Sequence, residues 1–344
     1  MKRFFIISSS SSMIIGSIIG AGFITGREVA SFFCGDMAVS SLYLTFVLFA
    51  VCIGVASGAD INAPTTRFFL SAARIFNVII TACMLAACNE SFKLLCHTEN
   101  NEILLMITVF IAFFISRNGV GGTEKFSLVF LPVALIVFII LLCMREEIDI
   151  TALRISPATF TGGALSPLLY VGMNVFFSLP VIIASGENKS VYERITISTV
   201  SALALTVCIS VIGLVIVKGE VSDRPLPVAD LFSDNAIKFA IIGIISFIGI
   251  FSTLVCSVFA ASQFCGIKFS LFKKILLGLF CVALSKLGFT YIVDKIYPIT
   301  GVAGIVYVVC LILSQYFFRG RRLPRTSAPQ GRTVSRCLPL RDRV

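Results

Sequence analysis

Ten long apolar segments follow one another along the chain, separated by short polar stretches. Most of them have the roughly 20 residues that a helix needs to cross the hydrocarbon core of a bilayer. No stretch between them is long enough for a soluble domain. The pattern therefore predicts an all-α polytopic membrane protein with ten transmembrane helices. These are expected at about residues 4–33, 38–58, 75–96, 103–116, 126–144, 164–185, 195–217, 239–262, 275–293 and 297–318.

The first apolar segment differs from a simple membrane anchor. Its stretch "GSIIGAGFITGREVASFF", residues 16–33, holds four glycines and then the adjacent Arg27 and Glu28. Adjacent residues point about 100° apart on a helix, so these two charges do not pair well with each other. We expect one of them to form a gate with a charge on another helix. The alternative is that both lie close enough to the outer surface to be solvated.

The glycines of this segment predict an interruption of the helix. Their spacing in two pairs, Gly16/Gly20 and Gly22/Gly26, would by itself suit close packing against another helix. Packing does not explain the cluster Gly20-Ala21-Gly22, because a glycine inside a helix is about 1 kcal/mol less favourable than an alanine. Unwound main chain at membrane depth is tolerated where it lines a cavity. There its carbonyl groups can bind a cation and its N–H groups an anion.

The sixth segment, "LLYVGMNVFFSLPVIIASG", carries a matching signal. It contains Gly172, Asn174, Ser178 and Pro180, and a proline inside a helix kinks or breaks it. The two interrupted segments are five apart, so two blocks of five helices would run in opposite orientations. Broken helices at matching positions of inverted repeats indicate a secondary transporter. An unrelated proline kink is the alternative.

The eighth segment offers ligands for a cation. In "FIGIFSTLVCSVF", Gly249, Ser252 and Thr253 are spaced i, i+3 and i+4 and therefore share one helical face. Two hydroxyls and a weakly shielded carbonyl are hard oxygen ligands, which suit a small cation such as Na⁺. Alternatively, both hydroxyls bond back to the preceding turn, as is common in membrane helices.

These motifs resemble a known family. The stretch "IIGSIIGAGFITGREVASFF" is similar to the first helix of the YkvI-like family of bacterial membrane proteins, in which G-x-x-x-G-A-G-F-x-[ST]-G-x-E is characteristic. The Asn-x(5)-Pro from Asn174 to Pro180 and the "YPITG" from Tyr297 to Gly301 look similar too. The resemblance implies the LeuT-type fold of the amino acid–polyamine–organocation superfamily and a cation-coupled solute transporter.

The chain departs from the family pattern in two places. Arg27 stands where Gln is usual, and the single hydroxyl pair Ser252-Thr253 stands where two threonines are expected. Neither change removes the chemistry of the site, but the first bears on the gate.

We therefore expect a secondary active transporter that works by alternating access. It would couple the symport of a small solute, an amino acid or a related amine or carboxylate, to Na⁺. One alternative is a proton-coupled transporter of the same fold, acting through Glu28 or Lys286; another is a solute sensor that does not transport. The expected solute-binding residues are Gly20, Ala21, Gly22, Phe23, Asn174 and Phe177; the gate is Arg27 and Glu28; and Na⁺ is bound by Gly16, Ile19, Gly249, Ser252 and Thr253.

Composition and charge agree with a membrane protein. Hydrophobic residues make up 57% of the chain and charged residues 13%, against about 25% charged in soluble domains. Most Lys and Arg fall in the loops that an inside N-terminus makes cytoplasmic. We expect both termini in the cytoplasm, in a bacterial inner membrane. Because no cleavage site follows a short apolar core, the first segment is expected to be retained rather than removed as a signal peptide.

The net charge of +10 does not indicate nucleic acid. Residues 319–344 hold eight Arg and one Asp, so +7 of this charge falls in the tail. We expect the transporter domain at residues 1–318, with repeats at about 4–144 and 164–318, and a disordered tail beyond it. A basic tail next to a membrane helix most simply lies near anionic lipid. A regulatory or partner-binding role is the alternative.

Nothing in the sequence indicates an enzyme or a bound cofactor. The chain has a single histidine, His97, and no CxxC pair, phosphate-binding loop or paired carboxylates within the spans. Most of its 12 cysteines fall in apolar segments, where Cys acts as a small hydrophobe; a Cys34–Cys96 disulfide is the alternative. Glu90 and Lys93 are expected to pair, and Lys286 to reach outward to the membrane surface.

Overall fold

The computed structural model describes residues 2–33, 39–96, 101–117, 120–143, 165–219, 228, 231–232, 234–264 and 271–319. Helix is the regular structure throughout these residues, so the all-α class is confirmed. The helices are α1 (Lys2–Ile18), α2 (Ala21–Ile24), α3 (Arg27–Phe33), α4 (Val39–Ser57), α5 (Pro64–Cys96), α6 (Glu102–Ser116), α7 (Val120–Cys143), α8 (Leu165–Gly186), α9 (Val191–Gly219), α11 (Ala236–Phe264), α12 (Leu271–Ser285), α13 (Phe289–Lys295) and α14 (Tyr297–Arg319).

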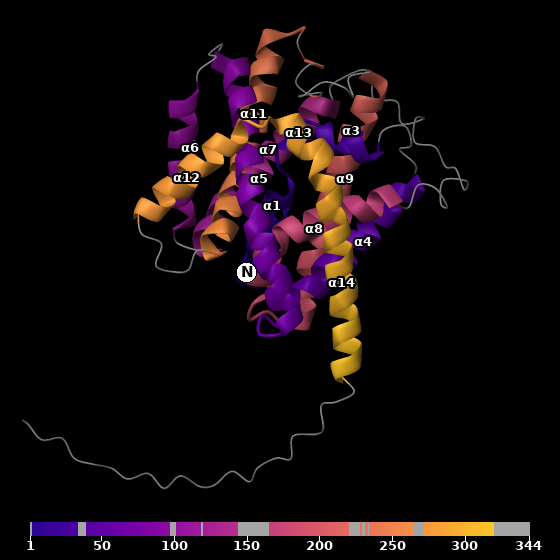
Figure 1. Cartoon of the computed structure of the whole chain (residues 1–344). Coiled ribbons are helices and arrows are strands. Elements are labelled where there is room, and N and C mark those ends of the chain that lie inside the picture. The colour runs from indigo at the N-terminus through magenta and orange to yellow at the C-terminus, as the bar shows by residue number, and fades with distance from the viewer. Residues whose placement is uncertain are drawn as a thin grey trace, which may run out of the picture.

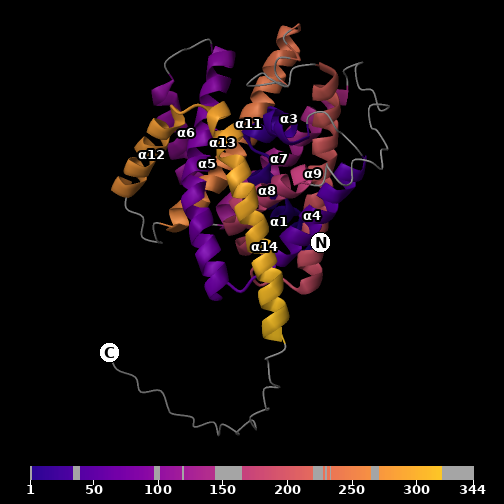
Figure 2. The same ribbon diagram turned by 45° about the vertical axis from the view of Figure 1, so that its right-hand side comes forward.

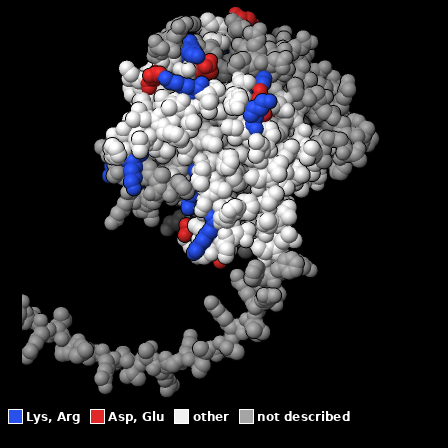
Figure 3. Space-filling model, viewed as in Figure 1, with Lys and Arg blue, Asp and Glu red and all other residues white. Residues whose placement is uncertain are grey.

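The chain is a multi-pass membrane protein. Among the described residues, six helices are long and apolar enough to cross a bilayer: α4, α5, α8, α9, α11 and α14. The count reaches eight if two bent pairs, α6 with the first part of α7 and α12 with α13, each form one span. Figure 3 shows charged side chains mainly in the upper part and at the lower edge of one face, with much uncharged surface between them. The count of ten stays a prediction.

Helices α1 and α8 form the centre of the bundle. α1 packs against α7, α8, α9 and α11, while α8 packs against α4, α5 and α14. In the apolar stretch of α8 that would cross the bilayer, 83% of the residues are buried inside the protein. In both Figure 1 and Figure 2, α6 and α12 lie together at one edge of the bundle. The first and sixth segments of the sequence therefore meet at the core.

The predicted break of the first segment is confirmed. α1 ends at Ile18, a single turn of helix follows as α2, and α3 starts at Arg27. The Gly20 N–H donates to Ile18 O at 2.8 Å instead of to Gly16 O four residues back. After α2, Gly26 has a φ of +80°, a conformation that glycine adopts without strain. The glycines thus allow two closely spaced interruptions, one on each side of α2.

The predicted interruption of the sixth segment is wrong. α8 is a single helix with Pro180 inside it. A proline lacks the N–H of the helical ladder and its ring crowds the carbonyl four residues before it, but the helices packed around α8 hold this buried turn in place. Gly172 serves packing, because a Cβ there would lie 2.5 Å from Gly301 O on α14. The Asn174 side chain donates to Tyr170 O of its own helix at 2.9 Å.

Only part of the predicted domain division falls within the residues that the structure describes. The two inverted repeats stay a prediction, and the tail from residue 320 onward lies outside the described residues, as do Cys34 and His97. The described cysteines whose side chains are placed are free thiols, and all but Cys310 are buried.

Candidate functional site

The break after α1 lies against the middle of α11. The Thr253 hydroxyl is 2.8 Å from Gly16 O and 3.0 Å from Ile19 O, and it donates its hydrogen to these two carbonyls. Both carbonyls belong to the last turn of α1 and the residue after it, where the helical hydrogen bonds end. Thr253 therefore joins α1 to α11 at the point where the first segment is interrupted.

The two other predicted ligands of α11 belong to the same stretch of this helix. The Ser252 hydroxyl is fully buried and has no hydrogen-bond partner among the described residues. Gly249 lies against the break, since a Cβ at this position would overlap Ile24 and come within 3.9 Å of Ile19 O. Among the described residues, neither hydroxyl bonds back to the preceding turn of α11, so that alternative fails. The structure thus brings Gly16, Ile19, Gly249 and Thr253 together, with Ser252 buried next to Thr253 in the chain.

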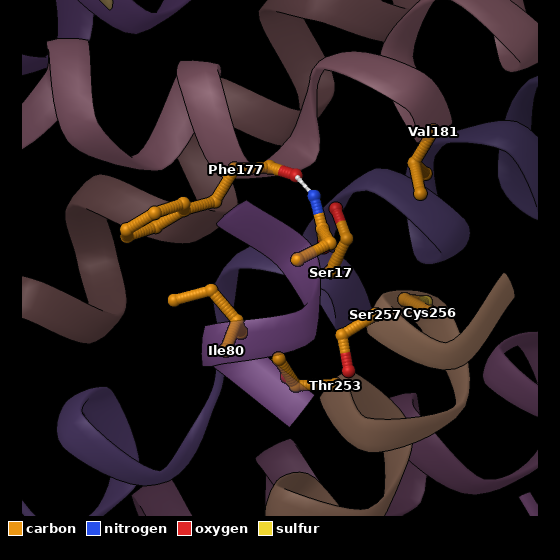
Figure 4. Close-up of a pocket in the computed structure, with 8 residues that line it drawn as sticks. Ser17, Ile80, Phe177, Val181, Thr253, Cys256 and Ser257 are labelled. Carbon is orange, nitrogen blue, oxygen red and sulfur yellow. Dashed lines mark hydrogen bonds between the residues drawn. The ribbon is translucent and has the colours of Figure 1, made fainter. Parts of the chain in front are cut away.

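A small cavity adjoins this cluster, with room for about one water molecule. Typical pockets for drug-sized ligands are far larger, so the site must open further before it can hold a solute. Figure 4 shows side chains from α1, α5, α8 and α11 around the cavity. They are Ser17, Asn77, Ile80, Phe177, Val181, Thr253, Cys256 and Ser257.

Asn77 of α5 is the main polar link across this cavity. Its buried side chain donates to Ala73 O at 2.8 Å and to Phe177 O of α8 at 2.9 Å, the dashed line in Figure 4. One turn further along α5, the Thr81 hydroxyl donates to Ser257 Oγ of α11 at 3.1 Å. These bonds tie α5 to α8 and to α11, two of the helices that line the cavity.

Only some of the predicted solute-binding residues lie at the cavity or beside Thr253. Phe177 lines the cavity, whereas Asn174 does not, and Phe23 is fully buried in the hydrophobic core. Gly20 lies beside Thr253, because a Cβ there would lie 3.2 Å from Thr253 Cγ2. Gly22 lies against the side chain of Glu28 rather than against the cavity, and Ala21 begins the short helix α2.

The two predicted gate residues behave differently. Arg27 forms an ion pair with Asp294 of α13, with Nη2 and Oδ2 2.9 Å apart and the two side chains 14% and 35% exposed. This is the expected pairing of one charge with another helix. Glu28 is 3% exposed and forms no ion pair with any described residue.

The remaining charged pairs lie at the surface. Lys93 pairs with Glu90 at 3.0 Å, as the i,i+3 spacing predicts. Lys286 pairs with Glu102 of α6 at 2.8 Å, and both side chains are about two-thirds exposed (68% and 67%). Lys286 thus points away from the bundle and does not reach the candidate site.

Some residues at the site were not predicted as ligands. The polar stripe of Asn77 and Thr81 on the third apolar segment was the available signal, since buried polar residues in membrane helices are costly and face the interior. Asp294 and the aromatic Tyr170 and Tyr297 could not be identified, because only the fold places them near Arg27 and Glu28. Among the described residues, no group of three or more His, Cys, Asp or Glu could hold a transition metal.

Comparison with known proteins finds likeness in structure only. No protein-family model and no curated protein matches the chain. Mhp1, a nucleobase-cation-symport-1 family transporter in a closed conformation with bromovinylhydantoin bound, aligns at a TM-score of 0.57 and 13% identity, over 92% of this chain and 79% of that one. Inward-facing Mhp1 aligns at 0.51 and 14% identity, over 93% and 77%. A mutant manganese transporter of Eremococcus coleocola aligns at 0.47 and 16% identity, over 90% and 77%.

The two Mhp1 alignments cover nearly the whole chain at very low identity, so they show the fold alone. These matched proteins are membrane transporters and not enzymes. Membership of the YkvI-like family stays a prediction. The chain is an all-helical membrane protein with the LeuT-type fold that the sequence predicts.

Proposed function

We propose that the protein is a secondary active transporter that couples the symport of a small solute to Na⁺. The observation that carries the proposal is the contact of Thr253 with Gly16 O and Ile19 O at the break of the first segment. Two main-chain carbonyls and the Thr253 hydroxyl lie in one place, and the buried Ser252 hydroxyl belongs to the next residue of α11. These are hard oxygen ligands, which suit an alkali cation. The fold shared with Mhp1, named a cation symporter, supports the proposal.

The cation would act by joining α1 to α11. In the structure, a single Thr253 hydrogen serves two carbonyls, and the adjacent Ser252 hydroxyl has no partner among the described residues. A bound Na⁺ would be coordinated by the carbonyls of the α1 break and by a hydroxyl of α11 at once. It would therefore favour the arrangement in which the two helices touch, and solute binding nearby would favour the same arrangement. Alternating access follows if the two ligands stabilise closure together.

The solute would be an amino acid or a related amine or carboxylate. It would lie between the break at Gly20–Phe23 and the face of α8 around Phe177, where the cavity provides polar and aromatic groups. The Arg27–Asp294 ion pair would close the outer side. We further propose a bacterial inner-membrane location with both termini in the cytoplasm and the basic tail near anionic lipid.

The test is Na⁺-dependent transport by the purified protein in proteoliposomes. A screen of labelled amino acids and amines under an inward Na⁺ gradient is expected to give uptake that stops when K⁺ replaces Na⁺. Thr253→Ala and Ser252→Ala should each reduce Na⁺-dependent uptake, whereas Thr196→Ala should not. The Thr196 hydroxyl is the matched control, because it is exposed and bonds only to Tyr192 O of its own helix.

Two outcomes would favour the alternatives. Uptake driven by a pH gradient without Na⁺ would indicate proton coupling, for which the buried carboxyl of Glu28 is the candidate. Saturable solute binding without counterflow would indicate a sensor.

A further inference from the structure

Glu28 is a buried carboxyl group in a position made for it. Its side chain is 3% exposed, and its Oε2 has no hydrogen-bond partner among the described residues. The carboxyl group folds back onto Gly22 of α2, where a Cβ would overlap Oε1, Cγ and Cδ of Glu28. The glycine therefore leaves the space that the carboxyl group fills, at the interruption of the first segment.

No positive charge of the described residues meets this carboxyl group. The adjacent Arg27 is turned toward Asp294 of α13, which lies 2.9 Å from its guanidinium. The titratable groups that interact electrostatically with Glu28 are the Cys83 thiol and the hydroxyls of Tyr170 and Tyr297. None of these three can carry a positive charge. A buried carboxyl group either takes up a proton or meets a partner of opposite charge, and a cationic ligand would supply such a partner.

Aromatic rings surround the same region. The Tyr170 ring lies edge-on to Phe32 and Phe33, with centroids 5.4 and 5.3 Å apart. The Tyr297 ring lies 5.2 Å from Phe177. Aromatic faces attract organic cations through their quadrupole, so rings near an unpaired carboxylate favour a cationic ligand over an anionic one.

A series of side-chain contacts through Tyr297 and Phe177 links this region to the cavity next to the candidate cation site. Phe177 lines that cavity and contacts the Tyr297 ring, and the Tyr297 hydroxyl lies 3.5 Å from Cys83 Sγ on α5. Cys83 is one turn along α5 from Ile80, another residue of the cavity wall. A cavity opened past Tyr297 would let a small solute place its charged end at Glu28 and its apolar end against Phe177.

We propose that Glu28 binds the protonated amino group of the solute, so that the solute is a small organic amine or an amino acid and not a simple carboxylate. The inference rests on the proposed function only in placing the solute beside α2 and α8. It changes the predicted role of Glu28 from gate to ligand, and it leaves the gate to Arg27 and Asp294.

The test measures binding to the purified full-length protein in nanodiscs, without any need for transport. The probes are three matched sets that share an apolar body: alanine, ethylamine and propionate; leucine, isopentylamine and isocaproate; phenylalanine, phenethylamine and hydrocinnamate. Each is titrated by thermal shift and calorimetry, once in Na⁺ and once in K⁺. We expect ammonium-bearing members of at least one set to bind, and its carboxylate-only member not to bind.

Two variants assign the ammonium contact. Glu28→Gln keeps the shape and removes the charge, and it should weaken ammonium binding by about 30-fold or more, the usual effect of removing one partner of a buried charge pair. Gly22→Ala keeps the charge but must displace the carboxyl group, and it should weaken the same binding. Glu102→Gln is the matched control, because Glu102 is an exposed carboxylate paired with Lys286, and it should bind as the wild type does.

The outcomes separate this inference from the proposed function. Retained thermal stabilisation of Glu28→Gln by Na⁺ shows that the variant is folded and that its cation site is intact. If the wild-type protein shows no Na⁺ response but binds amines in a way that depends on Glu28, Na⁺ coupling is refuted and the inference stands. The inference is overturned if Glu28→Gln binds amines as tightly as the wild type, if only carboxylates bind, or if no ammonium-bearing probe binds. Normal amine binding with a lost pH response in Glu28→Gln would instead assign Glu28 to proton transfer.

Discussion

Replacement of Thr253 by valine is the sharpest perturbation of the candidate cation site. Valine has nearly the shape of threonine, so Thr253→Val removes the hydroxyl and little else. Two hydrogen bonds, at 2.8 and 3.0 Å, are lost together with one oxygen ligand. Interhelical hydrogen bonds in membrane proteins contribute about 0.6 kcal/mol on average and at most about 1.7 kcal/mol. Without Na⁺, we therefore expect the variant to be less stable by about 1 to 2 kcal/mol.

The Na⁺-dependent effect should be larger. At a Na⁺ concentration about 100 times the Kd, binding stabilises the folded protein by about 2.7 kcal/mol. Removing a residue that only hydrogen-bonds to a metal ligand weakens metal binding by about 10- to 100-fold. Removing the ligand itself is therefore expected to raise the Kd for Na⁺ by about a hundredfold. The same Na⁺ concentration would then equal the Kd and stabilise the variant by only about 0.4 kcal/mol.

The assay is unfolding of the purified protein in detergent across a Na⁺ titration at constant ionic strength, with K⁺ as the replacement ion. Thr196→Val serves as the control, since its hydroxyl bonds only within its own helix. The reasoning is refuted if Thr253→Val retains the full Na⁺-dependent stabilisation, whatever its stability in K⁺.

Three further predictions follow from the packing and the charges. Gly172→Ala should destabilise the protein by about 1–3 kcal/mol in chemical unfolding, because its methyl would press against Gly301 O of α14; unchanged stability would contradict this packing. Arg27→Ala and Asp294→Ala should show a coupling of up to about 1 kcal/mol in a double-mutant cycle, since the pair is only partly exposed; additive effects would exclude the gate contact. Lys286→Met should change stability by less than about 0.5 kcal/mol and leave Na⁺ dependence of uptake intact, and altered coupling would show that Lys286 takes part in transport.

The part of the site that the sequence predicted depends on local signals. The cluster Gly20-Ala21-Gly22 weakens a helix wherever it is placed, so the break of the first segment follows from composition alone. Ser252 and Thr253 follow Gly249 by three and four residues, so each lies near the face of α11 that carries Gly249. That this face meets the carbonyls of Gly16 and Ile19 was an expectation from the resemblance to a known fold, and the hydrogen bonds of Thr253 match its geometry.

The part that the sequence did not predict depends on neighbours distant in the chain. Pro180 favours a break locally, but the helices packed around α8 keep it continuous. Gly172 is a glycine like those at the break, but here the missing side chain allows α8 to lie close to α14. The contact of Glu28 with Gly22, and the turn of Arg27 toward Asp294, follow from how α2, α3 and α13 come together.

The Na⁺ site between α1 and α11 can be tested by direct Na⁺ binding. Radioactive sodium binding to the purified wild-type protein, with K⁺ as the background ion, requires neither a known solute nor transport. We expect saturable binding that Thr253→Val and Ser252→Ala abolish or strongly weaken and that Thr196→Val leaves unchanged. Absence of saturable Na⁺ binding in the wild type, or equal binding in Thr253→Val, would contradict the proposed site.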